Sequence, residues 1–293
     1  MPGTSADGVC QAGRPLFPLK DNIPTDRFPL VTVTLILVNV AMFLFFQHPS
    51  GFSGVDDRKV VEYGAIPYEL THPGRHCELG SALENGRLVP PTSATRRGRV
   101  ACEGQVVQTD AGSERVRSVS DRTPTWVTAF TSMFMHGGFL HIIGNMLFLW
   151  IFGNNVEDSM GRPRFAGYYL LGGLAALAGQ VVFSPDSTAP TIGASGAVAA
   201  VLGGYIVLFP RARVLTLVFI IFFFTLIELP AILMLGLWFL QQLYFSAAEL
   251  SDPLGRGTGV AYWAHIGGFV FGLLLIRAFV TRRKEVAPRF PLY

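Results

Sequence analysis

Long apolar runs are the feature that most constrains the fold of this chain. A helix needs about 20 mostly apolar residues to cross the hydrocarbon core of a membrane. The candidate segments are residues 30–46, 130–152, 165–183, 195–208, 214–245 and 260–280. Only 15% of all residues are charged, against roughly a quarter in soluble domains. The sequence therefore predicts an all-α membrane protein.

Two of these runs do not have the length of a simple membrane helix. Residues 195–208 are too few to cross from surface to surface, so this span is expected to start below the surface, at the end of a buried loop. The run 214–245 is too long for one upright helix, and Pro230 divides it. We interpret residues 214–228 as an interfacial or tilted segment and residues 230–245 as the fifth span, which gives a bundle of six transmembrane helices.

Basic residues predict the orientation of this bundle. With six spans, the Lys and Arg residues of the tails and short loops fall on one side of the membrane, as they do on cytoplasmic sides. They are Arg14, Lys20, Arg27, Arg162, Arg164, Arg211, Arg213, Arg282, Arg283 and Lys284. We therefore expect a plasma-membrane protein with a disordered cytoplasmic tail over residues 1–28, a membrane domain over 29–281 and a second cytoplasmic tail over 282–293.

The first extracytoplasmic loop is long and carries an insertion. Residues 71–121 are polar and rich in Gly and Arg, so they are expected to bury no core of their own and to be flexible. Cys77 and Cys102 could form a disulfide if this loop faces an oxidising compartment. His72 and His76 precede Cys77, which makes a metal site a second interpretation, but their spacing matches no standard zinc pattern.

Ser195 lies at the start of span four, in the string Gly193-Ala194-Ser195-Gly196. Reactive groups at membrane depth are costly and are functional-site hypotheses by default. The flanking glycines allow close approach of the backbone, and free N–H groups at a helix N-terminus can stabilise an oxyanion. The competing interpretation is a serine that only hydrogen-bonds to its neighbours within the membrane.

His265 lies in span six and is followed by Gly268 and Gly272. Small residues four positions apart allow a helix to press closely on its neighbour. Packing of this face against the helix that bears Ser195 would bring the imidazole within hydrogen-bond reach of the hydroxyl, as a general base requires. The alternative is a histidine that serves only as a structural hydrogen-bond donor.

His136, His141 and Asn145 form a polar cluster in span two. His141 and Asn145 are four residues apart, so they project from one face of a helix. Three interpretations are open: structural hydrogen bonds, a metal site, or donors to a developing negative charge. The metal site is the weakest, because no third carboxylate or cysteine ligand has suitable spacing.

The three motifs occur together and in order, over residues 136–145, 193–196 and 264–272. This combination is far more specific than any one of them. Through this combination of motifs the sequence resembles the rhomboid family of intramembrane serine proteases, roughly over residues 25–70 and 124–281. The resemblance implies a six-span bundle with a long first extracytoplasmic loop.

The resemblance also implies a mechanism. Ser195 would be the nucleophile and His265 the base, in a dyad without an aspartate. His141, Asn145 and the Ser195 amide would form the oxyanion hole, and His136 would be structural. The reaction would be hydrolysis of peptide bonds within or beside the transmembrane helices of substrate proteins, which would enter sideways past span five and the first loop. Neither a cofactor nor a metal is expected.

Two positions depart from the family pattern. Ala199 stands where members often carry an aromatic residue that packs under the histidine, and Val260 stands where a glycine is frequent. A different side chain must therefore orient His265; Tyr262 and Trp263 are the aromatic residues nearest to it in sequence.

Two other functions compete with proteolysis. A catalytically silent rhomboid-like protein that binds membrane clients typically lacks the serine or the histidine, and this chain keeps both. A transporter or channel would predict paired intramembrane acids or inverted repeats, whereas the only acid deep in an apolar run is Glu228. The net charge of +3, without a basic patch, a Walker loop or a dinucleotide fingerprint, argues against nucleic acids and nucleotide cofactors as partners.

Overall fold

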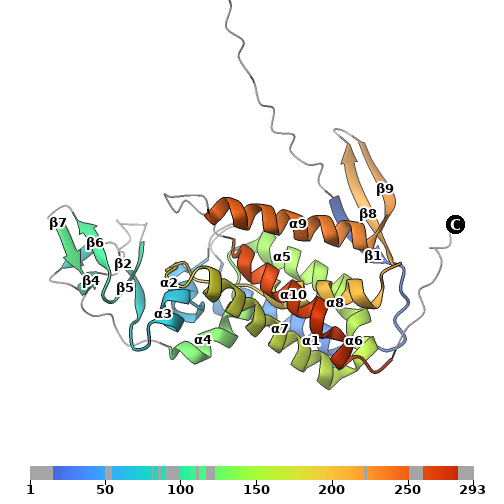
Figure 1. The fold of residues 1–293 in the computed structure, drawn as a ribbon, viewed down its shortest axis with the longest axis horizontal. Helices are drawn as coiled ribbons and strands as arrows, with labels where there is room; N and C mark the ends of the chain where they lie inside the picture. The colour runs from blue at the N-terminus through green and yellow to red at the C-terminus, as the bar shows by residue number, and fades with distance from the viewer. Residues whose placement is uncertain are drawn as a thin grey trace, which may run out of the picture.

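The computed structural model describes residues 16–49, 55–80, 82–84, 87–89, 99–109, 112–116, 123–220, 223–250 and 260–282. These residues form a bundle that is mostly helical, with small β-sheets at its two ends (Figure 1). The helices are α1 (Leu30–Ala41), α2 (Asp57–Tyr63), α3 (Pro67–Thr71), α4 (Thr125–Thr131), α5 (Phe139–Phe148), α6 (Asn154–Met160), α7 (Arg162–Phe183), α8 (Ser195–Leu208), α9 (Ala231–Leu250) and α10 (Tyr262–Phe279). The strands are β1 (Leu16–Asp21), β2 (Cys77–Gly80), β3 (Ala82–Glu84), β4 (Arg87–Val89), β5 (Arg99–Cys102), β6 (Val106–Thr109), β7 (Gly112–Arg115), β8 (Arg213–Ile220) and β9 (Phe223–Pro230).

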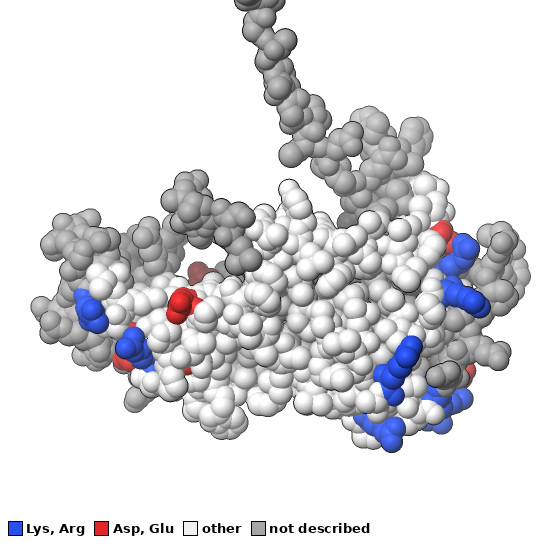
Figure 2. Space-filling model, viewed as in Figure 1, with Lys and Arg blue, Asp and Glu red and all other residues white. Residues whose placement is uncertain are grey.

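Helix length and composition identify an integral membrane protein. Four helical segments of the described chain are long and apolar enough to cross a membrane: Phe139–Met160, Arg162–Phe183, Ala231–Glu249 and Tyr262–Phe279. The first of them joins α5 to α6 through a wide helical turn, Leu149–Gly153. Leu30–Phe46 and Ser195–Leu208 are shorter apolar helices. On the face shown in Figure 2, most of the visible Lys and Arg lie at one end of the bundle, a few lie with Asp and Glu at the other end, and the middle carries no charge.

The second membrane helix begins later than the apolar run suggested. A helix was expected over residues 130–152, but α4 ends at Thr131 and is followed by a tight turn, Ser132–Phe134. The continuous helix starts only at Phe139, directly after Gly137 and Gly138, because adjacent glycines interrupt a helix readily. This offset moves His136 out of the helix and leaves His141 in its first turn.

The run between α8 and α9 is a β-hairpin, so the expectation of an interfacial or tilted segment in an all-α chain is wrong here. β8 and β9 pair antiparallel from Arg213 opposite Pro230 to Ile220 opposite Phe223. This stretch is rich in β-branched and aromatic residues, which favour strands. The hairpin projects from the bundle beside α9, at the end opposite the insertion (Figure 1).

The N-terminal tail is partly ordered, contrary to the expectation of disorder over residues 1–28. β1 adds to the hairpin edge as the third strand, in the order β1-β8-β9. Its last residue, Asp21, is buried, and its carboxylate accepts hydrogen bonds from Asn155 Nδ2 at 2.8 Å and Tyr205 Oη at 2.6 Å. The tail is therefore fastened to α6 and α8. Residues 1–15 lie outside the described part of the chain.

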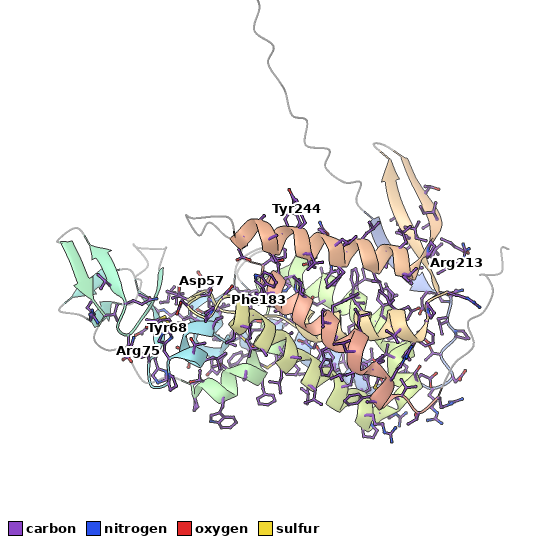
Figure 3. The ribbon with its side chains drawn as sticks, in the orientation of Figure 1. Asp57, Tyr68, Arg75, Phe183, Arg213 and Tyr244 are labelled. Atoms are coloured by element: carbon purple, nitrogen blue, oxygen red, sulfur yellow. A yellow bond between two sulfur atoms is a disulfide. The ribbon has the colours of Figure 1, made fainter. Side chains whose placement is uncertain are left out.

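The insertion forms local structure, and its described part is not the coreless segment that composition indicated. β2 pairs with β5, β3 with β4, and β6 with β7. A disulfide joins Cys77 to Cys102 and is buried against Val61 and Ile66. Tyr68 accepts a hydrogen bond from Arg75 Nη1 at 3.1 Å, at the junction of the insertion with the bundle (Figure 3). Cys77 is thus a disulfide partner and not a thiolate ligand.

α8 lies in the centre of the bundle, where it packs against α7 and α10. Every residue from position 196 to 205 is buried. Six of these ten are small: Gly196, Ala197, Ala199, Ala200, Gly203 and Gly204. Small side chains let neighbouring backbones approach closely and exclude lipid from the helix. The predicted loop-to-helix junction is confirmed, because α8 starts at Ser195 itself.

Candidate active site

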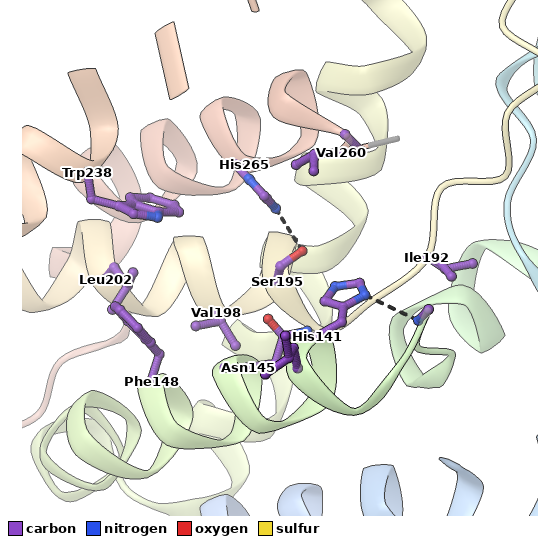
Figure 4. Close-up of a pocket in the computed structure, with 14 residues that line it drawn as sticks. His141, Asn145, Phe148, Ile192, Ser195, Val198, Leu202, Trp238, Val260 and His265 are labelled. Carbon is purple, nitrogen blue, oxygen red and sulfur yellow. Dashed lines mark hydrogen bonds between the residues drawn. The ribbon is translucent and has the colours of Figure 1, made fainter. Parts of the chain in front are cut away.

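Ser195 and His265 are in contact although 70 residues separate them in sequence. Ser195 is the first residue of α8, and His265 lies in the first turn of α10. Ser195 Oγ lies 2.8 Å from His265 Nε2, as the dashed line in Figure 4 shows. This is the geometry in which an imidazole can take a proton from a hydroxyl.

Glycines permit the approach of the helices that carry this pair. A Cβ added at Gly268 would meet the carbonyl oxygen of Gly196, and one added at Gly272 would meet that of Ala200. Gly193 precedes α8 with φ +117°, a conformation that other residues rarely adopt, and its backbone lies against the His141 ring. The two helices and the loop therefore meet without intervening side chains.

His265 is oriented from α9, by residues that sequence reasoning missed. Gln242 Oε1 lies 2.8 Å from His265 Nδ1, and the Trp238 ring tilts over the imidazole with 5.8 Å between centroids. Tyr262 and Trp263 do not fill this role, because they stack on Phe245 and Phe183. The signal that could have identified Gln242 is a carboxamide inside an apolar run, since such groups need partners in a membrane.

His141 and Asn145 lie on the other side of Ser195 (Figure 4). His141 Nδ1 accepts a hydrogen bond from the Gly137 amide at 3.2 Å, so the proton of the neutral ring is on Nε2. The same Nε2 lies close to Gly193, because a Cβ added at that glycine would be only 2.8 Å from it. Asn145 is buried, and its Nδ2 has no hydrogen-bond partner among the described residues. Both side chains can therefore donate to a ligand beside Ser195.

A cavity of about 490 Å³ joins these groups. His141, Asn145, Ser195 and His265 line it, together with the apolar side chains of Phe148, Val198, Leu202 and Trp238. α8 also begins at this cavity, and the N–H groups of a first turn have no partner within their helix. The arrangement supplies a nucleophile, a base and several donors around one space, as acyl transfer requires.

His136 lies next to this cluster but is held differently. Its backbone exchanges two hydrogen bonds of 2.8 Å with the Gln47 side chain. Its ring is fully buried and packs edge-on against Phe43 and His141, with 5.2 Å between the two imidazole centroids. These contacts support the wall behind His141. Among the described residues, no three His, Cys, Asp or Glu side chains gather closely enough to hold a metal ion.

Comparisons with known proteins identify the family. The Rhomboid domain matches residues 123–282, which include all the residues that line the cavity. Rhomboid protein 1, mitochondrial, of Saccharomyces cerevisiae is 31% identical over 160 residues, which are 53% of this chain and 42% of that protein. Presenilin-associated rhomboid-like protein A, mitochondrial, of Danio rerio is 28% identical over 173 residues, 54% of this chain and 40% of that protein.

A bacterial relative bears the name of a protease. Rhomboid protease GluP of Bacillus subtilis is 38% identical over 78 residues, which are 27% of this chain and 15% of that protein. The chain thus spans less than half the length of each of these relatives. The Rhomboid domain itself covers more than half of this chain, and the chain belongs to the rhomboid family.

Proposed function

We propose that this chain is an intramembrane serine protease that hydrolyses peptide bonds within or next to the transmembrane segments of other membrane proteins. The observation that carries the proposal is the 2.8 Å contact between Ser195 Oγ and His265 Nε2 in a cavity at the start of α8. The family includes serine proteases, and one relative bears the name of a protease.

The proposed reaction proceeds through an acyl-enzyme. His265 takes the proton of Ser195, and the serine oxygen attacks the substrate carbonyl carbon. The imidazolium then gives that proton to the leaving amine, and the same histidine activates the water that releases the acyl group. Water is proposed to reach the cavity from the side that carries the insertion. A substrate helix must unwind to expose its scissile bond, so Gly or Pro near that bond should favour cleavage.

The oxyanion hole is proposed to consist of His141 Nε2, Asn145 Nδ2 and the Ser195 amide. Asn145→Ala should lower kcat by about 10²- to 10³-fold with little change in KM, because its amide donates to charge that develops only in the transition state. Steady-state cleavage in proteoliposomes measures this effect. Ile143→Ala, on the exposed side of the same helix, is the control and should behave as the wild type. An unchanged kcat in Asn145→Ala would contradict the role.

Reconstitution tests the proposed function. The purified full chain in proteoliposomes is mixed with a single-pass substrate that carries Gly and Pro in its membrane segment, and cleavage is followed with fluorophosphonate labelling of Ser195. Cleavage together with labelling supports an intramembrane serine protease. A folded protein that retains the substrate, cleaves nothing and takes no label is a silent client-binding rhomboid, the competing function.

We also propose six spans, with α1 and α8 as the two short ones. α8 rises about 21 Å and would complete its crossing with the loop that precedes Ser195. Arg162, Arg211 and Arg282 are exposed; they lie at the start of α7, between α8 and β8, and after α10. These basic residues favour a cytoplasmic location for the end of the bundle that carries β1, β8 and β9, and for both termini. Two relatives are named mitochondrial, whereas we propose the plasma membrane for this chain. The proposed location predicts that fluorescent fusions label the edge of the cell and that tags at both termini resist protease added outside the cell. Mitochondrial labelling would overturn it.

A further inference from the structure

The inner face of α9 carries a polar group that a two-residue mechanism leaves unexplained. Leu235, Trp238, Gln242 and Ser246 recur at helical spacing and turn toward the bundle, and Gln242 is only 5% exposed. The opposite face of α9 is exposed and carries large hydrophobic residues, among them Leu240 and Tyr244; Tyr244 points away from the bundle (Figure 3). A carboxamide at membrane depth is costly without partners, so the partners of Gln242 indicate why it is there.

Both ends of the Gln242 amide are engaged. Its Nε2 donates to the Trp238 carbonyl oxygen at 3.4 Å, one turn earlier on α9. Its Oε1 is therefore the atom that lies 2.8 Å from His265 Nδ1. An amide oxygen can only accept, so Nδ1 must carry the imidazole proton. The other ring nitrogen, Nε2, is then unprotonated and able to accept the proton of Ser195 at 2.8 Å.

We propose that Gln242 is the positioning residue of the Ser195–His265 pair: it fixes the tautomer and the ring plane of the histidine, and it does so from α9. In soluble serine proteases a buried aspartate fixes the histidine tautomer in this way. Here a neutral amide takes that place, which avoids a buried carboxylate in the membrane. The inference rests on the proposed protease function for its kinetic consequences, but the hydrogen bond and the tautomer do not depend on it.

The position of α9 makes this support conditional. Among the four long helices, α9 buries the smallest share of its most apolar stretch, 28% against 39–50% in the others. It contacts α10 through ring stacking, with Phe239 on Phe269 at 4.4 Å and Phe245 on Tyr262 at 5.3 Å between centroids. An outward shift of α9 by roughly 1 Å would take the Gln242 contact beyond hydrogen-bond range. Gln242 therefore supports the dyad only while α9 is packed against α10.

Substitution of Gln242 tests the positioning role. In the full chain in proteoliposomes, Gln242→Leu should lower kcat by about 10- to 100-fold, a part of the ~10²–10⁴ that acid–base catalysis supplies, and leave KM within about twofold. Nitrogen NMR of ¹⁵N-histidine-labelled protein should show His265 protonated at Nδ1 in the wild type and a mixture of tautomers in the variant. Gln242→Glu returns an acceptor oxygen and should restore the tautomer and most of kcat.

The neighbouring residue provides the matched control. Gln241 is exposed on α9, so Gln241→Leu makes the same chemical change and should leave kcat, KM and the His265 signals unchanged. The proposal is overturned if Gln242→Leu keeps the wild-type tautomer or stays within twofold of Gln241→Leu in kcat. If Gln242→Leu does not fold, Gln242→Asn replaces it in the test. The Asn side chain is one methylene shorter, which moves the amide away from His265, and the same criteria apply. If the wild type cleaves nothing, the proposed function fails, and the NMR signals still decide the role of Gln242.

A second pair of variants tests the dependence on α9. Phe239→Ala removes the stack on Phe269 without changing the Gln242 residue itself, and Leu240→Ala truncates a neighbouring side chain of α9 that is 59% exposed. Phe239→Ala should give mixed His265 tautomers and a lower kcat, and Leu240→Ala should match the wild type. Wild-type His265 signals in Phe239→Ala would show that the tautomer does not depend on how α9 is packed.

Discussion

Replacing Ser195 by alanine should lower kcat for a transmembrane substrate by about a millionfold, to the background of the assay, while the protein stays folded. The size follows from the loss of the acyl-enzyme route, as in soluble serine proteases. Folding should survive because the hydroxyl bonds His265, a group that lines a cavity and is not locked in the core. Steady-state cleavage and thermal unfolding in the same detergent measure the two quantities. Persistent cleavage in this variant would exclude Ser195 as nucleophile.

His265→Ala should give a loss of similar size, and the double variant should be no slower than either single one. Residues that act as a unit in one proton transfer are strongly non-additive. Ser132→Ala is the matched control: that serine is also buried near the site, but its hydroxyl bonds Ala129 O within its own helical turn. It should remain within about twofold of the wild type. Losses that multiply in the double variant would indicate that Ser195 and His265 act in separate steps.

The second large effect is expected on stability. Gly268→Ala should destabilise the bundle by about 1–3 kcal/mol or more, because the added methyl group meets the backbone carbonyl of Gly196 and not a flexible side chain. α8 and α10 must then separate, which also stretches the contact between Ser195 and His265. The measurement is reversible unfolding in mixed micelles, with the rate of fluorophosphonate labelling as the local readout.

Gly167 provides a control with the opposite sign. It lies in α7, and nothing is within 4 Å of a Cβ added there. Gly167→Ala should therefore leave stability unchanged or raise it by about 0.5–1 kcal/mol, since alanine loses less backbone entropy in a helix. Equal effects of the two substitutions would contradict the close approach of α8 and α10 as the source of the destabilisation.

The parts of the site that could be predicted from sequence are governed by local rules. His141 and Asn145 share a face because they are four residues apart in a helix. Ser195 could be placed at a helix start because span four was too short and followed a glycine. Gln242 escaped prediction because its contact with His265 joins two helices, and hydropathy does not reveal which face α9 turns to α10.

The strands escaped prediction for a related reason. The length of the run and Pro230 predicted an interfacial or tilted segment over residues 214–228, although Val214, Thr216, Val218 and Ile220 alternate as β-branched residues, which is a strand signal. β1 gave no comparable signal, because its partner β8 lies nearly 200 residues away. A short strand in a polar tail can be predicted only when the sheet edge with which it pairs is known.

The Glu157 side chain has a consequence for biosynthesis. It is buried, and it accepts hydrogen bonds from the Val31 amide at 3.0 Å and the Thr32 amide at 2.8 Å, at the start of α1. Glu157 leaves the ribosome 126 residues after Val31, or roughly 6–25 s later at ordinary rates of translation. Until then the first turn of α1 lacks its acceptor, so α1 is completed only after the later helix α6 has been synthesised.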